Sequence, residues 1–229
     1  MSLRPSLFAA LLVCALCLPA EETPCAAGAA ETAARIQKRY TAIKGFSADF
    51  EQTLTHRESG AVEKRKGVLL FQKPFLVRWE TEKPHRELLV VTGGEIWDYL
   101  PDEELAYRYP LSMVQDSRGI IQVITGQAAL TKDFDVKPDG EEGNFVRLRL
   151  HPREPGPQMV EAAIWADRAD GYIRRAELVD FYGNKNTVSF TSFHPGIQFG
   201  EKDFNFTPPA GVEVEDHSGK KTPQRELFK

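Results

Sequence analysis

The chain has 229 residues, of which 41% are hydrophobic and 27% are charged, and its formal net charge is −4. This length and composition are typical of one globular domain with a sizeable core. The mild acidity excludes the broad basic surface that nucleic acids require, so we expect no nucleic-acid partner.

The first 20 residues have the layout of a secretory signal peptide. Arg4 gives a positive start, and residues 7–18 form an apolar run that is too short to span a membrane. The alternative is a buried N-terminal helix. We expect export to the periplasm by a cleaved signal peptide, with cleavage after Ala20 or as late as Ala30. Loss of residues 1–20 removes one basic residue and leaves a formal charge of −5, from 28 basic and 33 acidic residues.

The cysteines predict neither a disulfide framework nor a metal cluster. Cys14 and Cys17 fall inside the expected signal, and Cys25 survives only if cleavage is early. None of the three follows the small residue that a lipid-attachment signal requires. We therefore expect a soluble exported protein without a lipid anchor.

The chain after the signal begins with one helix and continues as short strands. Apolar residues recur at helical spacing over residues 31–44, and Gly45 is a suitable stop. Residues 46–55 then alternate apolar and polar side chains, which is typical of a half-buried strand. Further strands are expected at 62–72, 75–80, 88–92, 95–99, 105–109, 145–150, 159–166, 172–179, 187–193 and 204–214.

Residues 112–129 interrupt this pattern with two glycines and a group of aliphatic residues, Ile120, Ile121, Val123 and Ile124. The segment predicts one or two short helices that lie against the sheet. About eleven strands joined by Gly, Asn and Asp turns favour one curved sheet or barrel that is mainly β. Residues 217–229 form a polar C-terminal tail.

The search for catalytic chemistry finds little. The five histidines, His56, His85, His151, His194 and His217, show no metal-ligand spacing. No nucleophile elbow, phosphate-binding loop or zinc-protease motif occurs. The Asp-x-x-Asp-Gly run at residues 167–171 fits a turn better than a calcium loop. We expect no enzyme activity, metal or cofactor, although a carboxylate pair brought together by the fold stays open as an alternative.

Apolar surface is the remaining candidate for function. Residues 67–101 carry Trp79 and Trp97 on consecutive strands, together with Phe71 and Val77. One interpretation is an ordinary packed core, because aromatic residues usually serve packing. The other is a cavity for an apolar ligand, because many strands share one apolar face and only a few helices are available to cover it.

Several motifs occur in one order along this chain. They are F-x-A-x-F-x-Q at 46–52, G-x-L-x-F-x-K-P at 67–74, R-W-E at 78–80, L-V-V-x-x-G-x-I-W-x-Y-x-P at 89–101, W-x-D-x-x-x-G at 165–171, E-L-V-D-x-x-G-N at 177–184 and F-x-F-x-P-P-x-G-V at 204–212. In this set and order, the chain resembles the outer-membrane lipoprotein carrier protein family, LolA. The resemblance covers about residues 31–216, which we expect to form the carrier-like domain.

The resemblance implies an incomplete antiparallel barrel with a helical lid over a hydrophobic cavity. It also implies a periplasmic chaperone, expected to be a monomer, that takes lipoproteins from an inner-membrane ABC transporter and hands them to an outer-membrane acceptor. The expected acyl-chain cavity comprises Phe46, Phe50, Leu69, Phe71, Val77, Trp79, Leu89, Val91 and Trp97. The expected lid comprises Ile120, Ile121, Val123 and Ile124.

Lys73 and Pro74 are the expected latch of this lid. In the family, an arginine before the conserved proline bonds lid backbone and keeps the cavity shut, and here that position is lysine. Lysine lacks the planar fork of arginine, so the latch is expected to be looser. A solvated lysine on an edge strand is the alternative.

Two other functions stay open. An outer-membrane lipoprotein acceptor or an envelope-stress sensor is expected to have the same fold. A periplasmic hydrolase requires a nucleophile or carboxylate pair that the sequence does not reveal.

Overall fold

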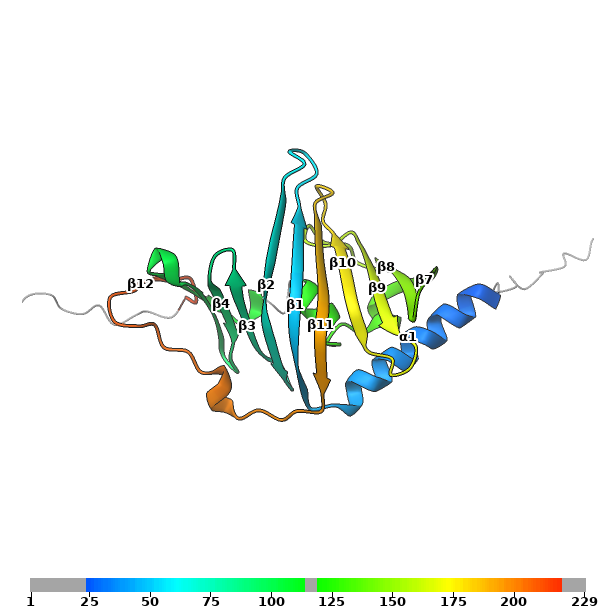
Figure 1. The fold of residues 1–229 in the computed structure, drawn as a ribbon, viewed down its shortest axis with the longest axis horizontal. Helices are drawn as coiled ribbons and strands as arrows, with labels where there is room; N and C mark the ends of the chain where they lie inside the picture. The colour runs from blue at the N-terminus through cyan, green and yellow to red at the C-terminus, as the bar shows by residue number, and fades with distance from the viewer. Residues whose placement is uncertain (1–23, 114–118, 220–229) are drawn as a thin grey trace, which may run out of the picture.

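The computed structural model describes residues 24–113 and 119–219 and arranges twelve strands in one open sheet (Figure 1). The strand order is β12-β6-β5-β4-β3-β2-β1-β11-β10-β9-β8-β7. Strands that are consecutive in the chain are therefore neighbours, except β6 and β7 and also β11 and β12. The two pairs that are not consecutive are β1 with β11 and β6 with β12. The expected signal peptide, residues 1–20, and residues 220–229 of the polar tail lie outside the described residues.

The first half of the sheet is an antiparallel meander. It consists of β1 (Gly45–Thr55), β2 (Val62–Gln72), β3 (Leu76–Lys83), β4 (Glu87–Val91), β5 (Glu95–Leu100) and β6 (Leu105–Pro110), with the short helix η1 (Pro101–Glu103) between β5 and β6. The order follows from the short Gly, Pro and Asn/Asp turns, which join each strand to its neighbour.

The second half begins with two short helices and returns along the other side of β1. Its elements are α3 (Ile120–Ile124), α4 (Leu130–Asp133), β7 (Phe134–Glu142), β8 (Phe145–Pro152), β9 (Glu161–Asp167), β10 (Ile173–Val179), β11 (Lys185–Pro195), η2 (Glu201–Phe204) and β12 (Glu213–Asp216). β11 pairs antiparallel with β1 and so joins the two halves, whereas β12 pairs parallel with β6.

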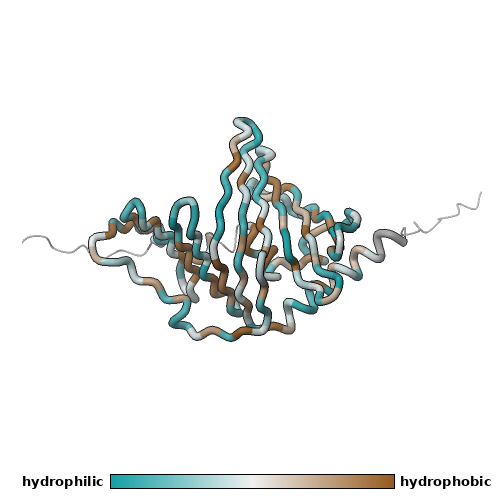
Figure 2. The backbone as a smooth tube through the Cα atoms, in the orientation of Figure 1, coloured by the Kyte–Doolittle hydropathy of each residue, from teal (hydrophilic) through white to brown (hydrophobic). Residues whose placement is uncertain are grey.

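Both faces of the sheet carry apolar clusters, but of different size. On the inner face, the sheet packs with α1 (Pro24–Ala42), α3 and α4 into the larger cluster. On the outer face, residues 199–212 pack against β2–β6 in a smaller cluster around Phe204. Figure 2 shows the apolar residues gathered in the lower part of the central strands, below the more polar β1–β2 hairpin.

The predicted fold class is confirmed, and the expected elements are corrected in three places. The helix expected at 31–44 begins earlier, at Pro24, and ends at Ala42. β7 was not predicted, because Pro138 and a bulge between Pro138 and Glu141 break its alternation. The strand expected at 204–214 is wrong: Phe204 ends η2, and only Glu213–Asp216 pair, in parallel with β6.

Candidate functional site

The main apolar cluster on the inner face unites eight of the nine residues expected to form the cavity. Phe46, Phe50, Leu69, Phe71, Val77, Trp79 and Val91 are buried in it, and the half-buried Leu89 packs against it. The rings touch across strands, with centroids 5.4 Å apart for Phe46 and Phe71 and 4.4 Å apart for Phe50 and Trp79.

The sheet register explains why these side chains meet. Phe46 lies opposite Phe71, Phe71 opposite Val77, and Val77 opposite Val91, so one apolar row crosses four strands. Side chains two residues apart along a strand share a face. A second row of side chains on the inner face therefore lies beside the first, two residues further along each strand.

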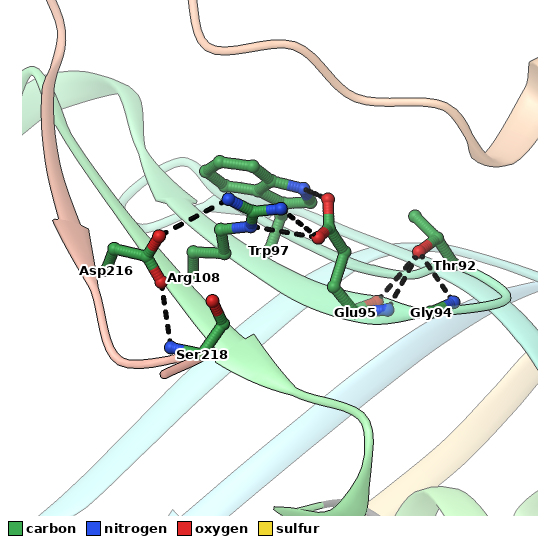
Figure 3. Close-up of polar contacts among 7 residues, drawn as sticks. All are labelled: Thr92, Gly94, Glu95, Trp97, Arg108, Asp216 and Ser218. Carbon is green, nitrogen blue, oxygen red and sulfur yellow. Dashed lines mark hydrogen bonds and ion pairs between the residues drawn. The ribbon is translucent and has the colours of Figure 1, made fainter. Parts of the chain in front are cut away.

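Trp97 is the residue that the prediction placed wrongly. It belongs to the smaller cluster on the outer face, with Phe204, and is 8% exposed. Its Nε1 donates to Glu95 Oε1 at 2.9 Å, and the Arg108 guanidinium lies 5.4 Å from the ring centroid (Figure 3). Arg108 also bonds Glu95 and Asp216, so Trp97 is part of the packing that joins β5, β6 and β12.

The short helix α3 covers part of the inner face. Ile120, Val123 and Ile124 are buried in the main cluster, and the half-buried Ile121 packs against it. All four residues expected to form the lid therefore contact the apolar cluster. Ile120 and Ile121 close a small cavity of about 140 Å³, whose other lining residues are Gln52, Arg65, Trp79, Glu87 and Leu89.

A second opening lies on the other side of Ile120. It has a volume of about 390 Å³, and its apolar lining includes Leu54 and Leu178. His56, Tyr182 and polar residues of the β10–β11 turn form much of the remaining lining. Since Ile120 borders both spaces, movement of α3 is the simplest change that would join them.

Charged groups that the sequence analysis missed lie beside the lid. Arg65 pairs with Glu63 at 2.6 Å and with Glu87 at 2.8 Å. Burial, together with the charge of Glu87, raises the pKa of the Asp98 carboxyl to about 6, against the opposing effect of Arg65. The alternation in β2, which places Arg65 on the face of Leu69, was the signal that could have revealed this group.

Lys73 makes the contacts expected of a latch, but with α1. Its Nζ donates to the carbonyl oxygens of Tyr40 at 2.8 Å and Thr41 at 2.7 Å, in the last turn of the helix. A cation there also interacts favourably with the helix dipole. Partial burial lowers the pKa of Lys73. Pro74 is exposed in the turn between β2 and β3.

Helix α1 in turn holds the segment that carries the lid. Gln37 Nε2 donates to the carbonyl oxygen of Gly126 at 3.1 Å, and Gln37 Oε1 accepts from the amide of Leu130 at 3.0 Å. Gly126 has φ of +69°, and a Cβ there would lie 2.3 Å from the Tyr40 ring. The contacts therefore run from the β2–β3 turn through α1 to the segment between α3 and α4.

Two further observations concern the described part of the chain. Within residues 24–113 and 119–219, no group of three or more His, Cys, Asp or Glu side chains is arranged to hold a metal ion. None of the helices described there is long and apolar enough to cross a membrane.

Comparison with known proteins gives consistent results. The family model described as "Outer membrane lipoprotein carrier protein LolA" matches residues 41–207. An outer-membrane lipoprotein carrier protein from Methylococcus capsulatus is 29% identical over 182 residues, which are 79% of this chain and 85% of that protein. A carrier protein of the same name from Xanthomonas oryzae is 29% identical over 174 residues, which are 75% of this chain and 82% of that protein.

Solved structures share the fold at low sequence identity. An uncharacterised conserved protein from Thermus thermophilus has a TM-score of 0.55 and 17% identity, and the match covers 82% of this chain and 99% of that one. The Mycobacterium tuberculosis lipoprotein LppX has a TM-score of 0.51 and 10% identity, and the match covers 76% of this chain and 99% of that one. These two matches show the open sheet with its helices and carry no information about ligands.

Proposed function

Because this chain belongs to the LolA family of outer-membrane lipoprotein carrier proteins, we propose that it is a periplasmic chaperone for lipoproteins. It binds their acyl chains on its inner face, carries them from the inner membrane and releases them at the outer membrane. One observation carries this proposal. A broad apolar sheet face is covered by α1 and two short helices, and one of these, the five-residue α3, borders two cavities.

The energetics explain why such a protein needs a lid. Exposing an acyl chain to water costs about 0.8 kcal/mol per CH₂, so acylated proteins do not leave a membrane unaided at a useful rate. A carrier must also release what it binds. When Ile120, Val123 and Ile124 fill the empty site, acyl chains displace them on entry, and this displacement lowers the net affinity.

The proposed acyl-chain site is the inner-face cluster without Trp97. Its residues are Phe46, Phe50, Leu69, Phe71, Val77, Trp79, Leu89 and Val91. Ile120, Ile121, Val123 and Ile124 form the lid. Lys73, with Pro74 fixing its turn, acts as the latch by holding the end of α1 against the sheet.

The remaining parts of the proposal concern the route. An inner-membrane ABC transporter loads the carrier, an outer-membrane acceptor unloads it, and a cleaved signal peptide exports it. The protein works as a monomer, uses no cofactor and catalyses no reaction. The relatives' names do not favour an acceptor or a stress sensor.

Depletion of the protein in the source bacterium tests this function. Lipoproteins normally found in the outer membrane should accumulate in the inner membrane, as measured by membrane fractionation. Protein purified from the periplasm should carry acylated lipoprotein detectable by mass spectrometry. Unchanged lipoprotein distribution after depletion, with no acylated material on the purified protein, would rule out the carrier function.

A further inference from the structure

Three stacked rings lie at the β6–β12 edge of the sheet. The ring centroids are 6.0 Å apart for Tyr107 and Tyr109, 6.2 Å for Tyr107 and His217, and 5.3 Å for Tyr109 and His217. The ring planes differ by at most 22°. The two tyrosines, on β6, are half-buried, and His217, directly after β12, is exposed. We name these three residues the edge platform.

The edge platform lies on the same face of the sheet as the acyl-chain site. Tyr109 packs against the main apolar cluster of the inner face. Arg108 pairs with Asp216 on the outer face (Figure 3). Because successive residues of a strand point to opposite faces, Glu215 and His217 lie on the inner face with the tyrosines.

Carboxylates surround the edge platform. Asp98 and Glu215 lie directly opposite Tyr107, on the strands to either side of it. Glu215 Oε2 is 3.5 Å from His217 Nε2, a contact that is an ion pair only when the histidine is protonated. Partial burial, followed by the negative charge of four carboxylates, raises the pKa of the Tyr107 hydroxyl. The four are Glu215, Glu103, Asp98 and Glu213.

The described residues compensate this negative charge only in part. Arg65, whose charge acts on Asp98, is already paired with Glu63 at 2.6 Å and with Glu87 at 2.8 Å. Asp98 Oδ1 is buried and has no hydrogen-bond partner among the residues that the structure describes. Accessible ring faces among carboxylates attract a cation, through the ring quadrupole and through charge.

One row of side chains connects the acyl-chain site to the edge platform. Trp79 lies opposite Leu89, and both line the small cavity beneath the lid. Leu89 lies opposite Asp98, which in turn lies opposite Tyr107. Neighbouring strands are about 4.8 Å apart, so Tyr107 lies roughly 10 Å from Leu89, and Glu215 roughly 14 Å.

We propose that the edge platform binds a basic segment of the cargo lipoprotein, a few residues beyond its acylated cysteine. This binding rests on the proposed carrier function and specifies which lipoproteins the carrier prefers. An extended peptide advances about 3.4 Å per residue, so a chain that leaves the small cavity beside Leu89 reaches the edge platform after about three or four residues. A lysine or arginine there contacts the ring faces and the carboxylates of Glu213 and Glu215.

The continuous row favours the cargo as the occupant over an unrelated protein. Acyl chains held in the cavity keep the attached peptide beside the edge platform at high effective concentration, so weak contacts suffice for a preference.

Three fluorescent palmitoylated peptides test this preference by titration of the purified protein. The first carries lysine at positions 4 and 5, counted from the acylated cysteine as position 1, and the second carries glutamine at both. The third carries its two lysines at positions 9 and 10, and so has the charge of the first peptide beyond the reach of the edge platform.

Two protein variants locate the contact. The first combines Glu213→Gln with Glu215→Gln, and its matched control combines Glu51→Gln with Glu58→Gln, at exposed positions of β1 and the β1–β2 turn. The second is Tyr107→Leu, which removes a ring and keeps an apolar side chain. Melting temperatures should show that all variants are folded.

The unaltered protein should bind the first peptide about five- to tenfold more tightly than the other two, and added salt should reduce this ratio. The ratio should fall below about twofold in the double glutamine variant and by about threefold in Tyr107→Leu. It should change by less than about twofold in the control.

Equal binding of all three peptides by the unaltered protein would overturn the preference alone and leave the carrier function intact. Equal binding of the first and third peptides, or a ratio that persists in both variants, would also overturn it. Failure to bind any of the peptides would overturn the carrier function and the preference together.

Discussion

Removing the amino group of Lys73 should make this protein hold acyl chains more tightly. The change is Lys73→Met, which keeps an unbranched apolar stem and deletes the donor to the carbonyl oxygens of Tyr40 and Thr41. α1 loses its contact with the β2–β3 turn, and the lid that rests on α1 opens at lower cost. Because acyl chains bind the open form, the opening cost is subtracted from the binding free energy.

The magnitude follows from the two hydrogen bonds. Each bond from a charged donor contributes about 1.5–3 kcal/mol when shielded from water. Lys73 is half-buried, so solvent screening reduces the pair to about 2 kcal/mol in total. Two kcal/mol correspond to about a 30-fold change in an equilibrium constant. The dissociation constant of an acylated peptide should therefore fall by up to about 30-fold, and its release should slow by a similar factor.

The assay is titration of the purified protein with a fluorescent palmitoylated peptide, followed by transfer of the bound peptide to vesicles. The Lys73→Arg variant should bind and release the peptide like the unaltered protein, or its lid should open more slowly, because the arginine guanidinium can donate to both carbonyl oxygens. Lys38→Met, at an exposed position of α1, is the matched control. Unchanged rates of peptide binding and release in both Lys73→Met and Lys38→Met would show that Lys73 does not hold the site closed.

Three further variants test the rest of the site. Leu89→Glu places a charge at a half-buried position of the small cavity and should weaken peptide binding by at least about tenfold without unfolding the protein, as titration and circular dichroism will show. A short thiol cross-link between Leu89→Cys and Ile121→Cys, which line that same cavity, should block peptide uptake until it is cleaved; uptake by the cross-linked form would contradict the lid. Asp98 has its pKa raised from 3.8 to about 6 in the folded protein, so its ionisation costs stability as the pH rises through that window. Asp98→Asn should thus raise the free energy of unfolding by up to about 3 kcal/mol above pH 6, and the gain should disappear near pH 4 in urea titrations; a gain independent of pH would refute the assignment.

The inner face could be predicted because its strands alternate cleanly. In β1, Phe46, Ala48 and Phe50 recur at every second position, so the sequence alone indicates one apolar face. The same rule failed at Trp97. β5 has apolar residues on both faces, since Ile96 joins the inner cluster and Trp97 the outer one. Which face of Trp97 is covered depends on a segment more than one hundred positions later in the chain.

Other features depended on contacts that sequence patterns do not encode. The resemblance to the family predicts a latch at Lys73, but only the structure shows that the hydrogen-bond partners of Lys73 are carbonyl groups of α1. Phe204 and Phe206 have the spacing of a strand, which led to the wrong strand prediction. Both pack on the outer face, but their segment does not pair with any strand. Arg65 and Asp98 interact electrostatically although β3 and β4 lie between β2 and β5, and no local pattern in either strand reveals this interaction.

An open sheet has two edge strands, and the covering of each has a consequence for the protein in a crowded periplasm. Unpaired edges invite strand addition from another chain, which leads to aggregation. At one edge, β12 is four residues long and carries Glu213, Glu215 and Asp216. It is therefore too short for extensive pairing, and its negative charges repel the same strand of another copy. At the other, Pro138 and the bulge beside it interrupt β7. Neither edge therefore offers a long flat strand to extend, and this favours a protein that remains separate from other copies when apolar surface is exposed, as the proposed carrier function requires.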